Sequence, residues 1–582
     1  MNRQQIYSPR AVEGLIADGD VIVIRNGNLL RLNGWLAKHP GGRLAILHMV
    51  GKDATDEINV YHSAGTLQRM EAYRIGRIQE PWTNFTPPIR GGVYRKEDEE
   101  SVESEEEDEL SLTSRLGSFN SSSTSLDIAP EIELDSLARN RHLSSGEKNS
   151  SGRQRLDAHI SSSSDGGDEN EFSGFSESHA LIPSITVRET AASYTSKVVQ
   201  QEIDDGIRDY PSLDVETQGA ITAKYRVLHQ RIEDEGYYDC RYSEYGKELI
   251  RYSLIFAVFI MTLRCEWYLT SACFLGLFWH QIMFTAHDAG HRGITHNFVV
   301  DTLIGMFVAD FCCGLSIGWW KSSHNVHHLV PNNPEHDPDI QNVPLFSTSP
   351  AFFKSLHSSY YDFTFAWDAF ADIAVQYQRY TYYPVMGIAR FNLYLLSWLH
   401  LLSPRSMNIG AATWTRPTEI GFMLCYWFLF GYCLLWRSIP TWTSRVAFVL
   451  VSHVITFPLH IQITLSHWGM PTADLGDGEA FAQRQLRTTM DVDCPEWLDF
   501  IHGGLQFQAV HHLFPRVPRH NLRRLQVLVR EFCKDTGIEY KILGFVDANK
   551  GVLSRLGEVE KQVEMLVKCQ QYMAETGESG LH

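Results

Sequence analysis

Four apolar runs constrain the fold of this chain more than any other feature of its sequence. A helix that crosses a membrane needs about 20 mostly apolar residues, and each run approaches that length. The runs cover about residues 249–264, 267–286, 418–436 and 444–464. They form two pairs, each joined by a short polar turn. They therefore predict two helical hairpins whose turns lie on one side of the membrane, with the rest of the chain on the other.

Two further apolar stretches are less suited to crossing a membrane. Phe298–Trp320 is interrupted by Asp301, Asp310 and several glycines, and Leu393–Leu402 is short. We expect the first to lie in the membrane interface or to dip into it, and the second to be too short to span.

The composition excludes several classes of protein once these runs are set apart. The formal net charge is −18, whereas a nucleic-acid-binding protein would need a basic face. The ten cysteines show no CxxC spacing, and many lie in apolar runs. They are therefore expected to be buried thiols facing a reducing cytosol, with neither a disulfide framework nor a zinc ribbon.

Residues 1–85 have the pattern of a small globular domain. Val21–Arg25 and Leu29–Leu32 read as strands joined at Asn26-Gly, a hairpin signal. Helix-like segments follow at Leu44–Val50 and Gly65–Ile75.

An acidic and serine-rich segment separates this domain from the apolar runs. Residues 91–190 contain too few large apolar side chains to offset the entropy lost on ordering, which predicts a disordered linker. Beyond it, Ala223–Glu235 has helical periodicity and either lies along the membrane surface or packs on the domain behind it. Residues 519–582 read as a soluble, helical C-terminal segment.

One histidine motif lies in the N-terminal domain. His39-Pro-Gly-Gly42 is followed by His62, and two imidazoles on opposite faces of a haem leave its iron no open position, which suits electron transfer. A single His-Pro-Gly-Gly could also be a surface turn. The quartet and the second histidine resemble cytochrome b5 over residues 8–80, which implies that His39 and His62 are the axial ligands of haem b.

Three more histidine clusters lie near the ends of the apolar runs. Box one is His287-Asp-Ala-Gly-His291, box two is His324-Asn-Val-His327-His328, and box three is Gln508-Ala-Val-His511-His512. On a helix, residues three or four apart share a face, so each box directs its imidazoles one way. Seven histidines exceed the four ligands that one zinc ion takes and suit two iron ions better.

The three boxes resemble the membrane desaturases of fatty acids and sphingolipids, over residues 210–555. Gln508 at the start of box three, together with a fused b5 domain, is typical of front-end desaturases. Three stretches look most like the fungal Δ8-sphingolipid desaturases: residues 224–231, His336-Asp-Pro-Asp-Ile-Gln341 and Thr464-Leu-Ser-His467-Trp.

That resemblance implies a fold, an activity and its cofactors. The fold is a b5-like α+β haem domain joined by the linker to an α-helical membrane domain with four spans. The activity is O₂-dependent desaturation of the long-chain base of ceramide, with haem b and two non-haem iron ions. Electrons come from NADH–cytochrome b5 reductase at the endoplasmic reticulum membrane, with the haem domain and the boxes on the cytosolic side.

Other polar residues near the boxes are candidates for ligands or for residues that support them. His467 is expected to be a further iron ligand, His336 a possible one, and Gln508 either a ligand or a hydrogen-bond partner of one. His280 faces the side of His287 and could support it, while His453 and His460 should face the protein interior because a span buries them. Asp288 either orients a ligating imidazole or is a surface carboxylate.

Two other activities and one non-enzymatic role fit part of the sequence. A front-end acyl-lipid desaturase of the Δ6 type shares most of these motifs. A b5-fused lipid hydroxylase would use the same metals, but such enzymes normally have histidine at the position of Gln508. A membrane haem carrier would bind one iron per chain and use the other histidines structurally.

Overall fold

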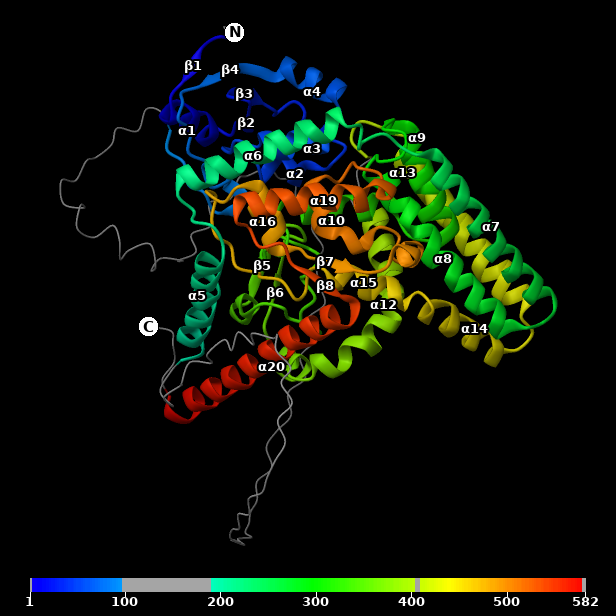
Figure 1. Cartoon of the computed structure of the whole chain (residues 1–582). Coiled ribbons are helices and arrows are strands. Elements are labelled where there is room, and N and C mark those ends of the chain that lie inside the picture. The colour runs from blue at the N-terminus through cyan, green and yellow to red at the C-terminus, as the bar shows by residue number, and fades with distance from the viewer. Residues whose placement is uncertain (1–2, 97–189, 404–408, 578–582) are drawn as a thin grey trace, which may run out of the picture. The chain divides into compact units, whose positions relative to one another are not determined.

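The computed structural model describes residues 3–96, 190–403 and 409–577. Nearly all of the predicted disordered linker, residues 91–190, lies outside the described residues. The described residues all belong to one compact unit of the chain. The architecture matches the predicted class, an α+β N-terminal domain followed by a helical membrane domain (Figure 1).

A four-stranded sheet in the order β1-β4-β3-β2 forms the centre of the N-terminal domain. The predicted hairpin is confirmed, because β2 and β3 pair antiparallel through Asn26 and Gly27, whose φ angles are 50° and 70°. A two-residue turn with both φ angles positive matches the twist of the flanking strands. The elements are β1 (Ile6–Tyr7), α1 (Pro9–Ala17), β2 (Ile22–Arg25), β3 (Asn28–Arg31), η1 (Leu36–Lys38), α2 (Arg43–Leu47), α3 (Thr55–Tyr61), α4 (Ala64–Met70), η2 (Glu71–Tyr73), β4 (Arg74–Ile78) and η3 (Pro88–Arg90).

One predicted helix of this domain is wrong at its end. The helix predicted over Gly65–Ile75 stops at Met70, and Arg74–Ile78 is the strand β4, parallel to β1 and antiparallel to β3. The pairing buries Ile75 and Ile78, so the sheet overrides the local helical pattern.

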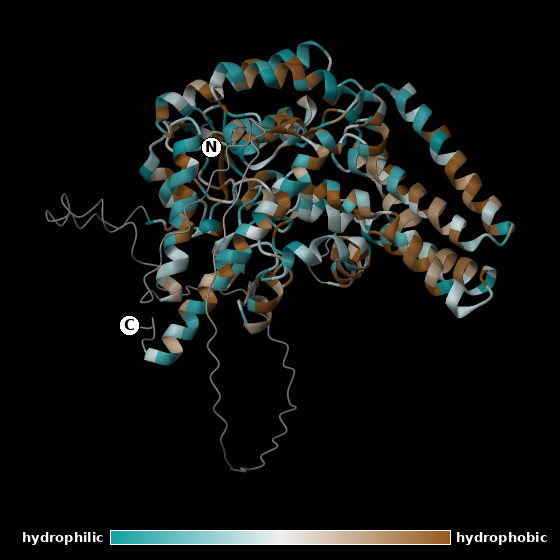
Figure 2. Ribbon diagram, turned by 60° about the horizontal axis from the view of Figure 1, so that its bottom comes forward, coloured by the Kyte–Doolittle hydropathy of each residue, from teal (hydrophilic) through white to brown (hydrophobic). Residues whose placement is uncertain are grey.

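Four helices are long and apolar enough to cross a membrane, as predicted, but the set differs by one. Three of them contain the predicted runs 267–286, 418–436 and 444–464, and the fourth is a helix that the sequence pattern did not predict. They are Tyr268–Gly290 (α8), Gln378–Leu402 (α12), Thr415–Ser438 (α13, Thr415–Trp427, with η7, Phe428–Ser438) and Trp442–Leu465 (α14, Trp442–Val454, with α15, Phe457–Leu465). Figure 2 shows the hydrophobic colouring along this group of helices.

The two differences have a physical reason. The predicted span 249–264 does form the end of a helix, α7 (Tyr242–Arg264), which lies against α8, but Lys247, Glu248, Arg251 and Arg264 make it more polar than the others. Leu393–Leu402, predicted to be too short to span, is only the last part of α12, whose first half is rich in tyrosine. Apolar runs therefore show where most spans lie. They do not show the full length of a helix whose ends are polar or aromatic.

The remaining interrupted stretch folds back on itself. α9 (Phe298–Met306) continues into η5 (Phe307–Cys312), and the pair meets α10 (Ile317–Leu329) at a bend of 116°. This bend lets α10 carry box two back beside the end of α8.

Outside the spans, several helices pack into a body that holds the ends of the spanning helices. α6 (Val215–Asp234) packs on α19 (Arg519–Thr536), which confirms the second of its two predicted positions. α5 (Ala191–Asp209), which the sequence analysis missed, packs on the long C-terminal helix α20 (Phe545–Thr576). The other elements are η6 (Pro350–Lys354), β5 (Leu356–Ser358), β6 (Phe363–Phe365), α11 (Ala369–Val375), α16 (Phe481–Thr488), β7 (Asp491–Asp493), η8 (Glu496–Leu498), α17 (Asp499–His502), η9 (Leu505–Phe507), α18 (Gln508–Leu513) and β8 (Ile542–Gly544).

Candidate haem and metal centres

The two histidines of the N-terminal domain face each other. His39 follows η1 and His62 ends α3, and their ring centroids are 5.9 Å apart. Nδ1 of His39 bonds the carbonyl of Gly42 at 2.9 Å, and Nδ1 of His62 bonds that of Ile58 at 2.8 Å. Because Nδ1 carries the hydrogen in these bonds, the lone pair of Nε2 in each ring is free to bind a metal ion. With metal–nitrogen bonds of about 2 Å, the spacing fits one iron between two imidazoles, as in a six-coordinate haem.

The glycines of the motif are needed for this approach. A Cβ on Gly41 would lie 2.6 Å from Cε1 of His39, and Gly42 has φ +87°, a conformation that side chains disfavour. The turn therefore folds tightly against the imidazole that it positions.

The three boxes come from three separate elements. Box one ends α8, box two fills the second half of α10, and box three lies on α18. Their rings meet: the centroid of His511 lies 4.7 Å from that of His287 and 4.6 Å from that of His291. The helical spacing of each box does turn its imidazoles toward one region.

Three groups of donor atoms within the described residues could hold a metal ion, and two of them consist of histidines alone; the third is His327 with Asp337 and Asp339. In both histidine groups, one nitrogen from every histidine lies within 4.8 Å of one from each of the others. The first group is His287, His291, His324 and His511, and the second is His327, His467 and His512.

Many of these nitrogens are buried and have no hydrogen-bond partner within the described residues. Leaving one polar atom unsatisfied in the interior costs about 1–3 kcal/mol. This many unsatisfied nitrogens in one place therefore indicate a missing partner. The orphaned atoms are Nε2 of His287, His291, His511 and His512, and Nδ1 of His328 and His467. An all-nitrogen donor set of this kind fits iron ions.

The protonation of three of these histidines suits metal binding. Burial lowers the pKa of His511, His512 and His467 well below the usual range, and neighbouring histidines lower it further. Neutral imidazoles keep the lone pair that a metal needs.

Hydrogen bonds to two side chains orient the second group. Asp337 accepts a bond from Nδ1 of His327 at 2.8 Å. Burial disfavours the His327 cation, but Asp337 and Asp339 outweigh it and raise the pKa of His327 to about 9. Gln485 accepts from Nδ1 of His512 at 2.9 Å. Such partners fix which nitrogen points at a metal, and the spacing of the histidines predicts neither partner.

Three other predicted residues take varied positions. His328 lies outside both groups, with Nε2 3.0 Å from that of His324 and its ring stacked on His512. His336 also lies outside them, and Nδ1 of His336 bonds the Ser359 hydroxyl at 2.9 Å. Gln508 is buried on α18, and its Oε1 has no hydrogen-bond partner among the described residues.

The residues that were candidates to support the ligands also take different positions. Asp288 is buried, so the surface alternative is wrong, and it bonds Arg519 and Tyr245, with Oδ1 3.7 Å from Nδ1 of His287. His453 and His460 are buried, as predicted, and each bonds a backbone carbonyl. Neither they nor His280 belong to the two groups.

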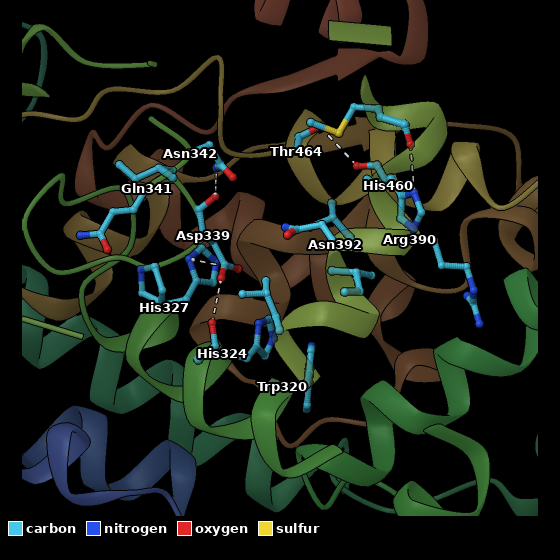
Figure 3. A pocket seen from close by; sticks show the side chains of 18 of the residues that line it. Trp320, His324, His327, Asp339, Gln341, Asn342, Arg390, Asn392, His460 and Thr464 are labelled. Atoms are coloured by element: carbon cyan, nitrogen blue, oxygen red, sulfur yellow. Dashed lines mark hydrogen bonds and ion pairs between the residues drawn. The ribbon is translucent and has the colours of Figure 1, made fainter. Parts of the chain in front are cut away.

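A cavity of about 910 Å³ opens onto the metal groups. It lies among α8, α10, α12 and α15, and its walls are mostly apolar. Figure 3 shows His324 and His327 on one side of this cavity and His460 and Arg390 on the other. A few polar side chains, such as Asn342, Asn392 and Thr464, line it between apolar ones. The volume and lining suit a long apolar ligand with a small polar group.

Ion pairs hold the N-terminal domain against this body. Asp477 bonds Lys52 at 3.2 Å and Arg90 at 2.9 Å, and Lys52 is almost fully buried. Two further pairs cross the same interface, Glu57 with Arg484 at 2.9 Å and Asp56 with Arg226 at 2.7 Å.

The interface brings the haem ligands close to box two. Tyr61, which precedes His62, lies edge-on to His328 with 6.2 Å between ring centroids. Asn325 of α10 donates to the carbonyl of Gly41 at 3.2 Å. Tyr61 and His328 therefore lie between the haem ligand His62 and the two donor groups.

Sequence profiles of two families match the chain. The cytochrome b5-like heme/steroid binding domain matches residues 8–79, and the fatty acid desaturase family matches residues 266–544. The second range contains all three boxes and His467.

Relatives extend the match to the whole chain. The Δ8-(E)-sphingolipid desaturase of Emericella nidulans is 47% identical over 99% of this chain and 98% of its own length. The enzyme of the same name from Komagataella phaffii is 42% identical over 97% of this chain and 95% of its own length. The acyl-lipid (9-3)-desaturase of Borago officinalis is 34% identical over 60% of this chain and 77% of its own length. With both of its domains matched and relatives aligned from end to end, the chain belongs to the cytochrome b5-fused fatty acid desaturases, a family of membrane oxidoreductases.

Proposed function

We propose that this desaturase introduces a Δ8-(E) double bond into the long-chain base of ceramide or a related sphingolipid. The observation that carries the proposal is the 47% identity to a Δ8-(E)-sphingolipid desaturase over 99% of the chain. The similarity to an acyl-lipid desaturase covers much less of the chain, at lower identity.

The two histidine groups are the proposed ligands of two iron ions. His287, His291, His324 and His511 hold one ion, and His327, His467 and His512 hold the other. His328 and Gln508 lie beside them and complete or support the site, and His336 is left outside it. Bound iron supplies the strong oxidant that removal of hydrogen from an unactivated methylene needs, with O₂ as co-substrate.

The residues of the chain position the substrate and protect the reaction. The apolar cavity takes the hydrocarbon base from the membrane, because α8, α12 and α15 contribute both to its walls and to the spans. Its dry walls exclude water from the site of oxidation. Asn342, Asn392 and Thr464 offer hydrogen bonds to hydroxyl and amide groups, which fixes the distance from the polar group to the histidines.

Electrons reach this site through the N-terminal domain. His39 and His62 hold haem b, and Tyr61 bridges the space from His62 to His328. NADH–cytochrome b5 reductase is the proposed source of electrons, at the cytosolic face of the endoplasmic reticulum.

Expression in a host that lacks Δ8-unsaturated bases tests the proposal. Mass spectrometry of the lipids should reveal long-chain bases lighter by two hydrogens, and the His512→Ala variant at equal abundance should yield none. A product heavier by one oxygen would show a hydroxylase, and new double bonds confined to fatty acids would show an acyl-lipid desaturase. Either result would overturn the proposal.

A further inference from the structure

Three cationic side chains of the helical body surround the haem site of the N-terminal domain. Arg292 directly follows box one, Lys321 precedes box two, and Arg516 follows box three. All three are half-buried, so they are partly withdrawn from water. Each of the three lies next to a different box in the sequence, so together they lie beside all three histidine elements.

Their contacts place them at the haem ligands. Arg516 donates to the backbone carbonyl of His62 at 2.7 Å. Lys321 lies one helical turn before Asn325, which bonds the carbonyl of Gly41, so this face of α10 meets the His-Pro-Gly-Gly turn. Arg292 and Lys321 also lie within electrostatic range of His39, and Arg292 and Arg516 lie within that of His62.

None of the three cations forms an ion pair within the described part of the chain, and the carboxylates of Asp301 and Glu233 act on them only at longer range. Arg292 lies over the ring of Phe298 at 5.0 Å and Arg516 over that of Tyr238 at 5.2 Å, while Lys321 donates to the carbonyl of Gly290. The cations also repel one another, since Arg292 lies within electrostatic range of both Arg516 and Lys321. Positive charges held together away from water need an anion to offset their desolvation.

The haem of the proposed function carries such anions, its two propionate carboxylates. Arginine matches a carboxylate with paired N–H donors, and such charge-assisted bonds are stronger than neutral ones. We propose that Arg292, Lys321 and Arg516 bind the haem propionates, so that the cofactor itself joins the N-terminal domain to the histidine boxes. These are positioning residues, which direct the propionate edge of the haem toward the boxes.

Redox titration of the full-length protein tests this role, which rests on the proposed haem. A cation bonded to a propionate favours the reduced haem, because reduction removes one positive charge from the iron centre. Lys321→Gln and Arg516→Gln should therefore each lower the ratio of reduced to oxidised haem several-fold at fixed potential. A tenfold change corresponds to 59 mV for this one-electron couple.

Matched controls keep the test decisive. Arg530→Gln, on α19, removes a cation that bonds Gln526 at 3.3 Å, and it should leave the ratio unchanged. The Soret absorbance per protein should remain close to that of the wild type in every variant, which shows that the haem domain is folded and loaded. Equal ratios in the wild type, Lys321→Gln and Arg516→Gln would overturn the proposal.

Esterified haem separates propionate bonding from charge at a distance. Full-length protein produced without haem is loaded with haem dimethyl ester, whose propionates carry no charge and cannot accept the same bonds. The substitutions should then change the ratio much less than with native haem. An undiminished effect would overturn propionate binding. Wild-type protein that binds no haem at all would refute the proposed function instead, so the two failures are distinguishable.

Discussion

At the scale of single residues, two side chains orient histidines of the second donor group. Asp337 fixes His327 and Gln485 fixes His512, and both bonds leave the other ring nitrogen facing the second donor group. Gln485 also donates to the carbonyl of His328 at 2.8 Å, so one amide connects boxes two and three. The helical spacing of the histidines predicted that they would converge. It could not identify Asp337 or Gln485, because only the tertiary fold brings them to the boxes.

The Asp337→Asn variant should lose iron and activity while it remains folded. An amide accepts a weaker bond from His327, and loss of such a partner typically costs about 10–100-fold in metal affinity or activity. Non-haem iron in the purified protein and product formation measure the effect. Asp339→Asn is the matched control, because Asp339 lies farther from His327, at 3.8 Å, and its loss should cost less. Equal iron and product in Asp337→Asn and the wild type would show that the bond plays no part.

The haem ligands should be separable from the iron ligands. His62→Ala removes one imidazole of the facing pair, so we expect the haem absorbance to disappear. Non-haem iron should persist, because neither donor group includes His62. Desaturation with NADH should stop. If it continued in the absence of haem, the N-terminal domain would not be the electron donor.

At the scale of elements, the spans and the domain interface were predictable to different degrees. Hydrophobic runs identified three of the four apolar helices, but α12 was missed because its tyrosine-rich first half masks its length. The N-terminal hairpin followed from its Asn-Gly turn. The loop after α15, which carries Asp474 and Asp477, had no sequence signal, since its role depends on Lys52 and Arg90 of another domain.

Asp477→Asn should slow electron transfer without loss of either cofactor. The change leaves Lys52 buried without its ionic partner. Removing one partner of a buried ion pair typically costs about 3–5 kcal/mol of stability. Stopped-flow reoxidation of the reduced haem, with O₂ and substrate present, should show a lower rate. Asp205→Asn, which removes an exposed pair with Arg208, is the control and should leave the rate unchanged. An unaltered rate in Asp477→Asn would mean that this interface does not position the haem domain.

At the scale of the whole molecule, contacts between folded parts hold the haem domain in place, and the segment between them need only connect them. The ion pairs and the Asn325–Gly41 bond join residues far apart in the sequence within one compact unit. The two-domain organisation was readable from composition and motifs alone. The docking was not, because it arises from charges scattered over both parts.

Deleting residues 100–180 should therefore cost little thermal stability. Its composition predicts no hydrophobic core, and the ion pairs cited above join the described parts through residues outside this segment. Thermal unfolding of the deletion variant, followed by haem absorbance and by circular dichroism, checks this. A cooperative loss of stability would show that the segment folds and contributes to the native structure.

The central claim is that the histidine boxes hold two iron ions served by one haem, and the metal content of the purified protein tests it most directly. Iron analysis together with haem absorbance should give about two non-haem irons per haem in the wild type. His512→Ala should lose non-haem iron and all desaturated product, yet insert into membranes normally, because insertion depends on the apolar helices. Unchanged non-haem iron together with preserved product in His512→Ala would contradict the account.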